Sequence, residues 1–299
     1  MRGSGRPTGA PPVNRSDRDE LAPPLNAPGP DPRRATGAPP LVRGRGGIVL
    51  LAAIVAFCGL TPLLSPHDPY LPDPALALLP PSPRHWLGTD QLGRDLLTRT
   101  AAAGTISLLT AFAITAITTT IGTLAGTAAG LAGGLPERLL RQAATVALAL
   151  PGLTLALALA GVLPPGPGTM VAALVPFGWV NCGLIAHTAT RRVAASDFVL
   201  ATRALGASPS YLLRRTIAPH IAGPVLTVAT ADFARTLIAA TSLSFLGIGL
   251  PPPVTDWGGL VNDAVPLLIA APRLAIAPAI ALALTGVAVT LIVDARRLR

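Results

Sequence analysis

Six apolar runs, each long enough to cross a lipid bilayer, constrain this chain more than any other feature. They cover residues 46–64, 104–131, 142–163, 169–190, 220–247 and 273–293. A bilayer core about 30 Å thick is crossed by about 20 residues of α-helix, which satisfies its own backbone hydrogen bonds. Of the 299 residues, 51% are hydrophobic and only 12% are charged. We therefore expect an all-α membrane protein with six transmembrane helices.

The spacing of the runs predicts how the chain is organised. Residues 1–46 are rich in Pro, Gly, Ala and Arg without apolar periodicity, which predicts a disordered tail. Residues 47–64 are then the first transmembrane helix, and residues 65–103 form a polar, Pro-rich segment outside the membrane. Residues 104–299 form a core of five helices, which includes a polar loop at 191–219.

The positions of the Arg residues predict the orientation in the membrane. All 23 basic residues are Arg. With the N-terminus in the cytoplasm, 18 Arg lie on the cytoplasmic side and 4 on the outer side, as the excess of basic residues in cytoplasmic loops requires. We therefore expect both termini and the loop 191–219 in the cytoplasm and the segment 65–103 outside, in a multi-pass protein of the cell membrane.

Several classes of function are disfavoured by composition. A Walker A loop places a Lys on the phosphates, and these 299 residues contain no Lys, so ATP hydrolysis has to reside in another polypeptide. Aromatic residues make up only 4%, and the Arg residues lie almost entirely outside the apolar runs, which argues against a nucleic-acid surface. Cys58 and Cys182 lie inside apolar runs, as buried apolar side chains do. Ligand spacing is missing among the four histidines, so no metal or cofactor is expected: His67, His85, His187 and His220.

The polar segment 196–219, SDFVLATRALGASPSYLLRRTIAP, has the pattern of two short helices. Ser196 is suited to cap the first helix with its hydroxyl, and Asp197 is favourable in the first turn. Gly206 can adopt a left-handed conformation and end this helix. The first helix is thus predicted to stop at a sharp bend.

A second helix is predicted directly after the bend. Ser208 and Pro209 have the residue types of an N-cap and a first helical position, and Pro219 is expected to stop this helix before the fifth apolar run. The exposed side chains would include three basic residues, Arg203, Arg214 and Arg215. An ordinary amphipathic loop whose Arg residues contact anionic lipid is the alternative. A helix–bend–helix element is the interpretation that the Gly and Pro positions favour.

The segment ATRALGASPSYLLRRTIAP resembles the EAA loop of binding-protein-dependent ABC importer permeases. The family's Glu-Ala-Ala triplet corresponds to Leu200, Ala201 and Thr202, so its acidic position is apolar here. Its glycine corresponds to Gly206, and its Ile-x-Leu-Pro-like ending to residues 217–219, where Ala occupies the place of Leu.

Two further stretches resemble one branch of that family, the second (C-type) permease subunit of dipeptide, oligopeptide and nickel importers. HWLGTDQLGRDLLTR, residues 85–99, is similar to its LGTD…GRD signature. SLSFLGIGLPPPVTDWGGLVNDA, residues 242–264, is similar to its SFLG-x-G…P…WG signature. The three matches occur in the family's order, and the resemblance covers roughly residues 85–295.

The resemblance implies a MetI-like permease fold and a transport subunit without an ATPase site of its own. Its implied partners are a homologous permease in a heterodimer, two cytoplasmic ATPase subunits and an extracytoplasmic substrate-binding protein. The residues implied to couple to the ATPase are Ala201, Thr202, Arg203, Gly206, Ser208, Pro209, Tyr211, Arg214 and Pro219. The implied cargo is di- or oligopeptides, with nickel or a metal chelate as the alternative. A secondary transporter is the alternative from another class, although no internal repeat of the kind it requires is visible.

Within the apolar runs, one set of small residues predicts helix packing. Gly122, Gly126 and Gly130 recur every four residues and therefore share one helix face. Without side chains there, a neighbouring helix can approach closely.

Asp232 and Arg235 are charged residues near the middle of the fifth run. A charge at that depth costs about 3 kcal/mol on insertion scales, so each is expected to face the protein interior or water. Their spacing of three residues lets them pair on one helix face. A structural ion pair and a role in lining a transport pathway both remain open.

The segment 85–99 also carries local predictions. Thr89 has the residue type of a helix cap, and Arg94 is four residues from Asp90, with which it can bond. Trp86 and Trp257 are expected near the outer membrane interface, where indole rings are favoured.

Overall fold

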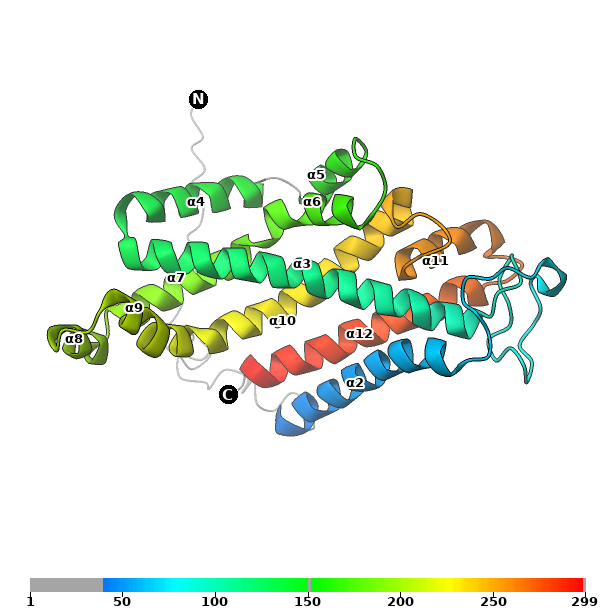
Figure 1. The fold of residues 1–299 in the computed structure, drawn as a ribbon, viewed down its shortest axis with the longest axis horizontal. Coiled ribbons are helices and arrows are strands. Elements are labelled where there is room, and N and C mark those ends of the chain that lie inside the picture. Colours follow the sequence, from blue (N-terminus) through cyan, green and yellow to red (C-terminus); the bar gives the residue numbers. More distant parts are fainter. Residues whose placement is uncertain (1–39, 150–151, 298–299) are drawn as a thin grey trace, which may run out of the picture. The chain divides into compact units, whose positions relative to one another are not determined.

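Five long apolar helices dominate the computed structural model, which describes residues 40–149 and 152–297 (Figure 1). Each is long and apolar enough to cross a bilayer: Gly44–Leu64, Leu96–Ala132, Pro167–Ala194, Leu212–Ile248 and Arg273–Arg296. The described residues contain helices and no strand, so the all-α prediction is confirmed. Residues 1–39, most of the predicted tail, lie outside the described residues, and the first described helix begins at Pro40.

The long helices consist of the labelled elements in Figure 1. They are α2 (Pro40–Leu64), α3 (Leu96–Ala132), α6 (Pro167–Gly178) followed by α7 (Val180–Ala194), α10 (Ala218–Leu243) and α12 (Arg273–Arg297). The predicted third crossing, 142–163, corresponds to α4 (Gly134–Ala149) and α5 (Gly152–Ala160), with residues 150–151 between them outside the described part. Five continuous crossings are therefore described, against the six predicted.

The glycine face of α3 packs directly against α7, as predicted. An added Cβ at Gly122 would lie 2.3 Å from the carbonyl oxygen of Trp179, and one at Gly126 would lie 2.1 Å from that of Gly183. Both distances are far below van der Waals contact, so the two backbones touch because these side chains are absent. In Figure 1, α3 lies between α4 and α10, and α7 crosses behind it.

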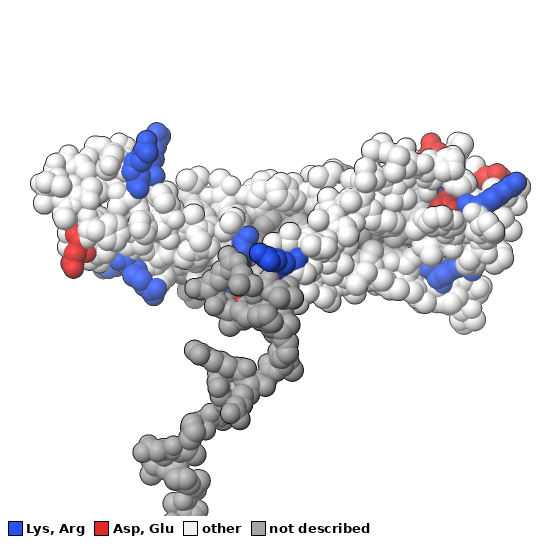
Figure 2. Space-filling view, turned by 90° about the horizontal axis from the view of Figure 1, so that it is seen from below, with Lys and Arg blue, Asp and Glu red and all other residues white. Residues whose placement is uncertain are grey.

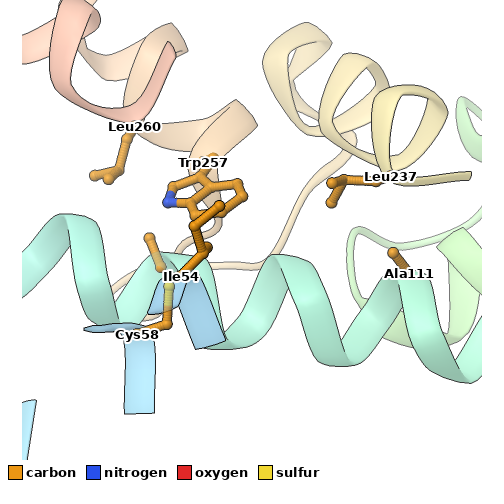
Figure 3. Packing of buried hydrophobic residues seen from close by; sticks show 7 residues of the cluster. Ile54, Cys58, Ala111, Leu237, Trp257 and Leu260 are labelled. Atoms are coloured by element: carbon orange, nitrogen blue, oxygen red, sulfur yellow. The ribbon is translucent and has the colours of Figure 1, made fainter. Parts of the chain in front are cut away.

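Trp257 is at the centre of the main apolar cluster, which joins α2, α3, α10 and α11 (Trp257–Ala264) (Figure 3). The members are Ile54, Cys58, Ala103, Ala111, Leu237, Trp257 and Leu260. The Trp257 indole N–H donates to the carbonyl oxygen of Thr100 at 3.0 Å, and the ring packs on Gly104. The ring is therefore fully buried within the protein, because α3 supplies both the apolar cavity and the acceptor that a buried indole needs. Its predicted depth near the outer membrane interface stays a prediction.

Apolar side chains cover much of the outer surface of the helices. Leu109, Phe112 and Leu124 on α3 are more than 60% exposed, as is Val49 on α2. Figure 2 shows that charged side chains on the visible face gather toward the two ends, with a basic group between them and uncharged surface elsewhere. A large exposed apolar surface of this kind fits a lipid environment.

Candidate coupling element and charged sites

The predicted helix–bend–helix element is formed by α8 (Asp197–Ala204) and α9 (Pro209–Tyr211). Gly206 ends α8 with φ of 87°, and its N–H donates to the carbonyl oxygen of Arg203 at 3.0 Å. An added Cβ at Gly206 would meet no atom within 4 Å. Glycine is thus needed at this position for its left-handed backbone and not for space.

Of the two predicted serine caps, one is confirmed. The Ser208 hydroxyl accepts the N–H of Tyr211 at 3.3 Å, as an N-cap does. The Ser196 hydroxyl instead donates to the carbonyl oxygen of Val193 at 2.5 Å, and makes no cap bond to α8. The capping prediction for Ser196 is wrong because its hydroxyl turns back to the Val193 carbonyl oxygen in the last turn of α7, which also accepts the Ser196 N–H.

Pro219 does not stop the second helix, contrary to the prediction. Residues Leu212–Ile217 form a π-helical turn that continues without a break into α10. The N–H of Ala218 reaches back five residues to the carbonyl oxygen of Leu213. Pro219 lies in the first turn of α10, and the wider turn before it accommodates a residue that has no N–H to donate. We refer to residues 196–219 as the candidate coupling element. One continuous helix therefore joins this element to the bundle.

The coupling element has a buried side and an exposed side. Val199, Leu212 and Ile217 are buried and fix it to the rest of the protein. Leu200, Leu205 and Tyr211 are exposed, and Leu205 is 89% accessible. Among the residues predicted to couple to the ATPase, Thr202 is half-buried, and the exposed ones are Ala201, Arg203, Gly206, Ser208, Tyr211, Arg214 and Pro219.

This element stands well beyond the ends of two other crossings. The Arg296 guanidinium, at the end of α12, donates to the Leu226 carbonyl oxygen at 3.2 Å and to the Thr230 hydroxyl at 3.0 Å. At 1.5 Å per residue, the helix continues about 20 Å from the level of Leu226 to Leu212. Figure 1 shows α8 and α9 beyond the ends of α2 and α12. An exposed apolar tip at this distance is available to a protein partner.

Asp232 and Arg235 form the predicted pair on α10. The Arg235 guanidinium donates to Asp232 Oδ1 at 2.6 Å. Asp232 is buried and also accepts from the Asn181 amide at 3.1 Å, with the Cys182 thiol 3.7 Å from its Oδ2. Sequence reasoning missed Asn181, whose only signal was an amide within an apolar run.

The exposure of the two charged side chains is unequal. The Arg235 side chain is 62% exposed, whereas that of Asp232 is 7% exposed. Ala234 and Leu237, which are close to Arg235 in the sequence, line a cavity together with Leu282. Because Leu282 lies near the middle of α12, Arg235 is near the middle of the helices. A guanidinium exposed at that depth is expensive against lipid, so it has to face water or another protein.

At the opposite end of the helices, the two signatures that were predicted to lie outside are joined by charged side chains, of which Asp90, Arg94 and Arg99 are buried and Asp263 is exposed. Arg94 Nε donates to Asp90 Oδ2 at 2.7 Å, which confirms the predicted pair. Arg99 lies 3.4 Å from the same carboxylate oxygen and 3.3 Å from Asp263 Oδ2 on α11. Partial burial raises the pKa of the Asp263 carboxyl, whose side chain is still 43% exposed, and the nearby Arg94 charge opposes this rise. Residues 85–99 and 242–264 therefore form one polar unit.

Asp95, and not Thr89, caps the helix that follows the first signature. Asp95 Oδ2 accepts the N–H of Thr98 at 2.9 Å at the start of α3. The buried Thr89 hydroxyl accepts the N–H of Leu79 at 2.8 Å and contacts the carbonyl oxygen of Leu76. The capping prediction for Thr89 is wrong because its hydroxyl holds the preceding loop. Trp86, in the same segment, is 72% exposed, and its position at the outer membrane interface stays a prediction.

Asp256 caps α11 as Asp95 caps α3. Its carboxylate accepts the N–H of Gly259 at 2.9 Å and the hydroxyl of Ser244 at 2.7 Å. Burial raises the pKa of Asp256, and these hydrogen bonds oppose the rise. The capped helix delivers Trp257 to the apolar cluster and Asp263 to Arg99.

Comparison with known proteins agrees with this arrangement. Residues 119–296 match the family described as "Binding-protein-dependent transport system inner membrane component". The oligopeptide transport system permease protein OppC of Bacillus subtilis (strain 168) is 30% identical over 222 residues, 74% of this chain and 73% of OppC. The dipeptide transport system permease protein DppC of the same organism is 32% identical over 223 residues, 75% of this chain and 70% of DppC.

A third relative extends the range of substrates in the names. The glutathione transport system permease protein GsiD of Escherichia coli O6:K15:H31 (strain 536 / UPEC) is 35% identical over 217 residues, 73% of this chain and 72% of GsiD. The family match covers more than half of the chain and includes the whole coupling element and the α11 signature. This chain therefore belongs to the family of inner membrane components of binding-protein-dependent transport systems.

Proposed function

We propose that this chain is the permease subunit of an ATP-driven importer of di- or oligopeptides. It forms half of the transport pathway with a homologous permease, receives cargo from an extracytoplasmic binding protein, and is driven by two cytoplasmic ATPase subunits. The single observation that carries the proposal is the exposed apolar tip of the coupling element, around Leu205 and Tyr211. Relatives named for oligopeptide, dipeptide and glutathione transport support a peptide cargo.

The coupling element is built to transmit movement. Its exposed tip fits an apolar groove of an ATPase subunit, and Arg203 adds charge at its edge. Val199 and Ile217 are buried, so the tip does not move independently of the helices below it. Because Leu212–Ile248 is continuous, a displacement of the tip is carried along this helix into the bundle.

The pair on α10 extends the proposal into the pathway. Asp232, which Asn181 holds in place, binds one side of the Arg235 guanidinium and leaves its other donors exposed. We place this exposed side toward the pathway and the homologous subunit, because lipid would not accept it. The exposed donors of the Arg235 guanidinium there fit the carboxylate of a peptide.

Co-purification with the ATPase tests the coupling role. Leu205→Asp places a charge on the exposed tip and should release the ATPase subunits without loss of the permease. Ile269→Asp is the matched control, since Ile269 is fully exposed on the segment between α11 and α12, at the other end of the helices. Retention of the ATPase by Leu205→Asp to the same extent as by Ile269→Asp would contradict the proposal.

Uptake measurements test the cargo. Cells with the complete transporter are expected to take up labelled di- and tripeptides, and to lose this uptake when the ATPase subunits are inactivated. Uptake of a nickel chelate without peptide uptake would favour the alternative cargo. Peptide uptake that persists without the ATPases would favour a secondary transporter.

Asp232→Ala separates the two roles of the charged pair. Loss of protein abundance with normal transport per molecule identifies a structural pair. Normal abundance with reduced transport, together with a similar defect in Arg235→Gln, supports the pathway role.

A further inference from the structure

We propose that the outer end of the bundle contains a site for a divalent transition-metal ion such as Zn²⁺, formed by His67, His85 and Asp95. A ligand atom from each of the three residues lies within 4.8 Å of the other two. His67 follows the end of α2, His85 lies in the loop before α3, and Asp95 caps α3. The sequence spacing gave no sign of this site, because the fold brings together residues from three separate segments.

The carboxylate of this cluster is held in a fixed orientation. Asp95 Oδ2 accepts the N–H of Thr98 at 2.9 Å and its hydroxyl at 2.8 Å, and Asp95 Oδ1 is 3.0 Å from His85 Nδ1. Asp95 and His85 are both buried. Metal ligands in proteins are commonly oriented by such outer hydrogen bonds, which reduces the entropy lost when the ion binds.

The second imidazole is what distinguishes the cluster from an ordinary His–Asp pair. The rings of His67 and His85 have centroids 4.6 Å apart, at an interplanar angle of 43°. Ser65 connects His67 to the same network: its hydroxyl is 3.5 Å from His67 Nδ1 and 2.8 Å from the Thr98 hydroxyl. A hydrogen-bonded His85–Asp95 pair is complete without a second imidazole, whereas His67 supplies the third ligand atom of a metal site.

The cluster is accessible from a cavity of about 940 Å³, of which His67, Asp95, Ser65 and Thr98 are lining residues. The cavity provides an entry path and room for a water or an external ligand on the ion. Arg84 is the cation among its lining residues. His67 is half-buried, so a rotation of its side chain can close the ligand spacing to the shorter separations that a bound ion requires.

The ligand types select the class of ion. Two imidazole nitrogens and one carboxylate oxygen suit Zn²⁺, Ni²⁺ or Cu²⁺, whereas Ca²⁺ and Mg²⁺ prefer oxygen ligands only. Three protein ligands leave a position open to the cavity, as in zinc sites that keep a water. A bound ion would tie the end of α2 and the loop at His85 to the start of α3.

Metal titration of the purified, tag-free full-length chain in detergent or nanodiscs tests the site. Zn²⁺ and Ni²⁺ are titrated in competition with a chromophoric chelator, with Ca²⁺ as the comparison ion. We expect one saturable Zn²⁺ site per chain, and a loss of affinity of at least about 10-fold in His67→Asn, since even outer partners of metal ligands contribute that much. His220→Asn is the matched control, because His220 is an exposed histidine on the coupling end of α10.

Thermal unfolding gives an independent measurement. Zn²⁺ should raise the unfolding temperature of the wild type and of His220→Asn, but not that of His67→Asn, because an ion bound only to the folded state stabilises it. His67→Asn is the deciding variant, since a half-buried position tolerates the change better than the buried His85 does. No saturable binding to the wild type, or equal binding by His67→Asn and the wild type, would overturn the proposal.

Discussion

The two ends of the helix bundle are stabilised by different means. At the end predicted to lie outside, charged side chains join three segments: the buried Asp90 contacts the buried Arg94 and Arg99, and Arg99 reaches the exposed Asp263 on α11. At the coupling end, α3 and α7 meet through glycines, and α8 is fixed by buried apolar side chains such as Val199. A network of buried charges fixes geometry but tolerates no missing partner. Apolar packing below an exposed tip leaves a surface free for a partner.

The largest expected effect is at the outer end. Asp90→Ala leaves the buried guanidinium groups of Arg94 and Arg99 without their shared carboxylate. Breaking a buried ion pair from one side costs about 3–5 kcal/mol. We expect the purified variant to unfold at a much lower temperature or to fail to accumulate in membranes. The surface substitution Asp68→Ala, in the same extended segment, should leave both properties nearly unchanged.

A smaller but still large effect is expected where α3 meets α7. Gly126→Ala places a Cβ 2.1 Å from the carbonyl oxygen of Gly183, so the two helices have to separate. Overpacking of this kind costs about 1–3 kcal/mol. Gly223→Ala is the control, because an added Cβ there meets nothing within 4 Å. If both variants unfold at the same temperature in detergent, the close contact of α3 with α7 does not contribute to stability.

These two regions also show what a single sequence can predict. The glycine face and the Arg94–Asp90 pair depend on residues four apart, and the bend depends on Gly206 itself, so all three were predictable. The Asn181–Asp232 bond spans 51 residues and the Arg99–Asp263 contact spans 164. No spacing rule reaches that far, so these partners emerge only from the fold.

The wrong predictions have a common cause. Ser196 and Thr89 have hydroxyls with several possible hydrogen-bond partners, and in each case a nearby loop or helix end supplies the partner in place of the predicted cap. Pro219 was expected to end a helix, but a π-helical turn before it removes the conflict. Residue type identifies the groups that need a partner, whereas packing decides which partner they find.

A substitution in the coupling element should affect function more than stability. Gly206→Val forces a β-branched residue to φ of 87°, which costs about 1–2 kcal/mol in the left-handed region. Insertion should be intact, because the site is exposed, while peptide uptake is abolished as the bend changes. Ala207→Val, one residue further along, is the control. Normal uptake by Gly206→Val would show that the bend does not transmit ATPase movement.

The smallest expected effect is on how the unfolding temperature depends on pH, and it arises in the half of the bundle next to the coupling element. Glu137, in the first turn of α4, accepts two hydrogen bonds from Arg141, at 3.1 and 2.9 Å, and also contacts Arg191 on α7. The bonds from Arg141, followed by the charges of Arg191 and Arg141, lower the pKa of Glu137 from its ordinary value of 4.5. His187 lies 3.6 Å from the same carboxylate.

The sign of this effect follows from the direction of the shift. A carboxyl whose pKa is lower in the folded state stabilises the protein above its ordinary pKa, and this contribution is lost as the pH falls through the folded pKa. The unfolding temperature of the wild type should therefore decrease more than that of Glu137→Gln between neutral pH and about pH 4. Because the ion pairs with Arg141 and Arg191 are at the surface, the difference should be small and should shrink further in high salt. Equal pH profiles at low salt would mean that Glu137 does not link α4 to α7, and that the coupling end depends on apolar and glycine packing alone.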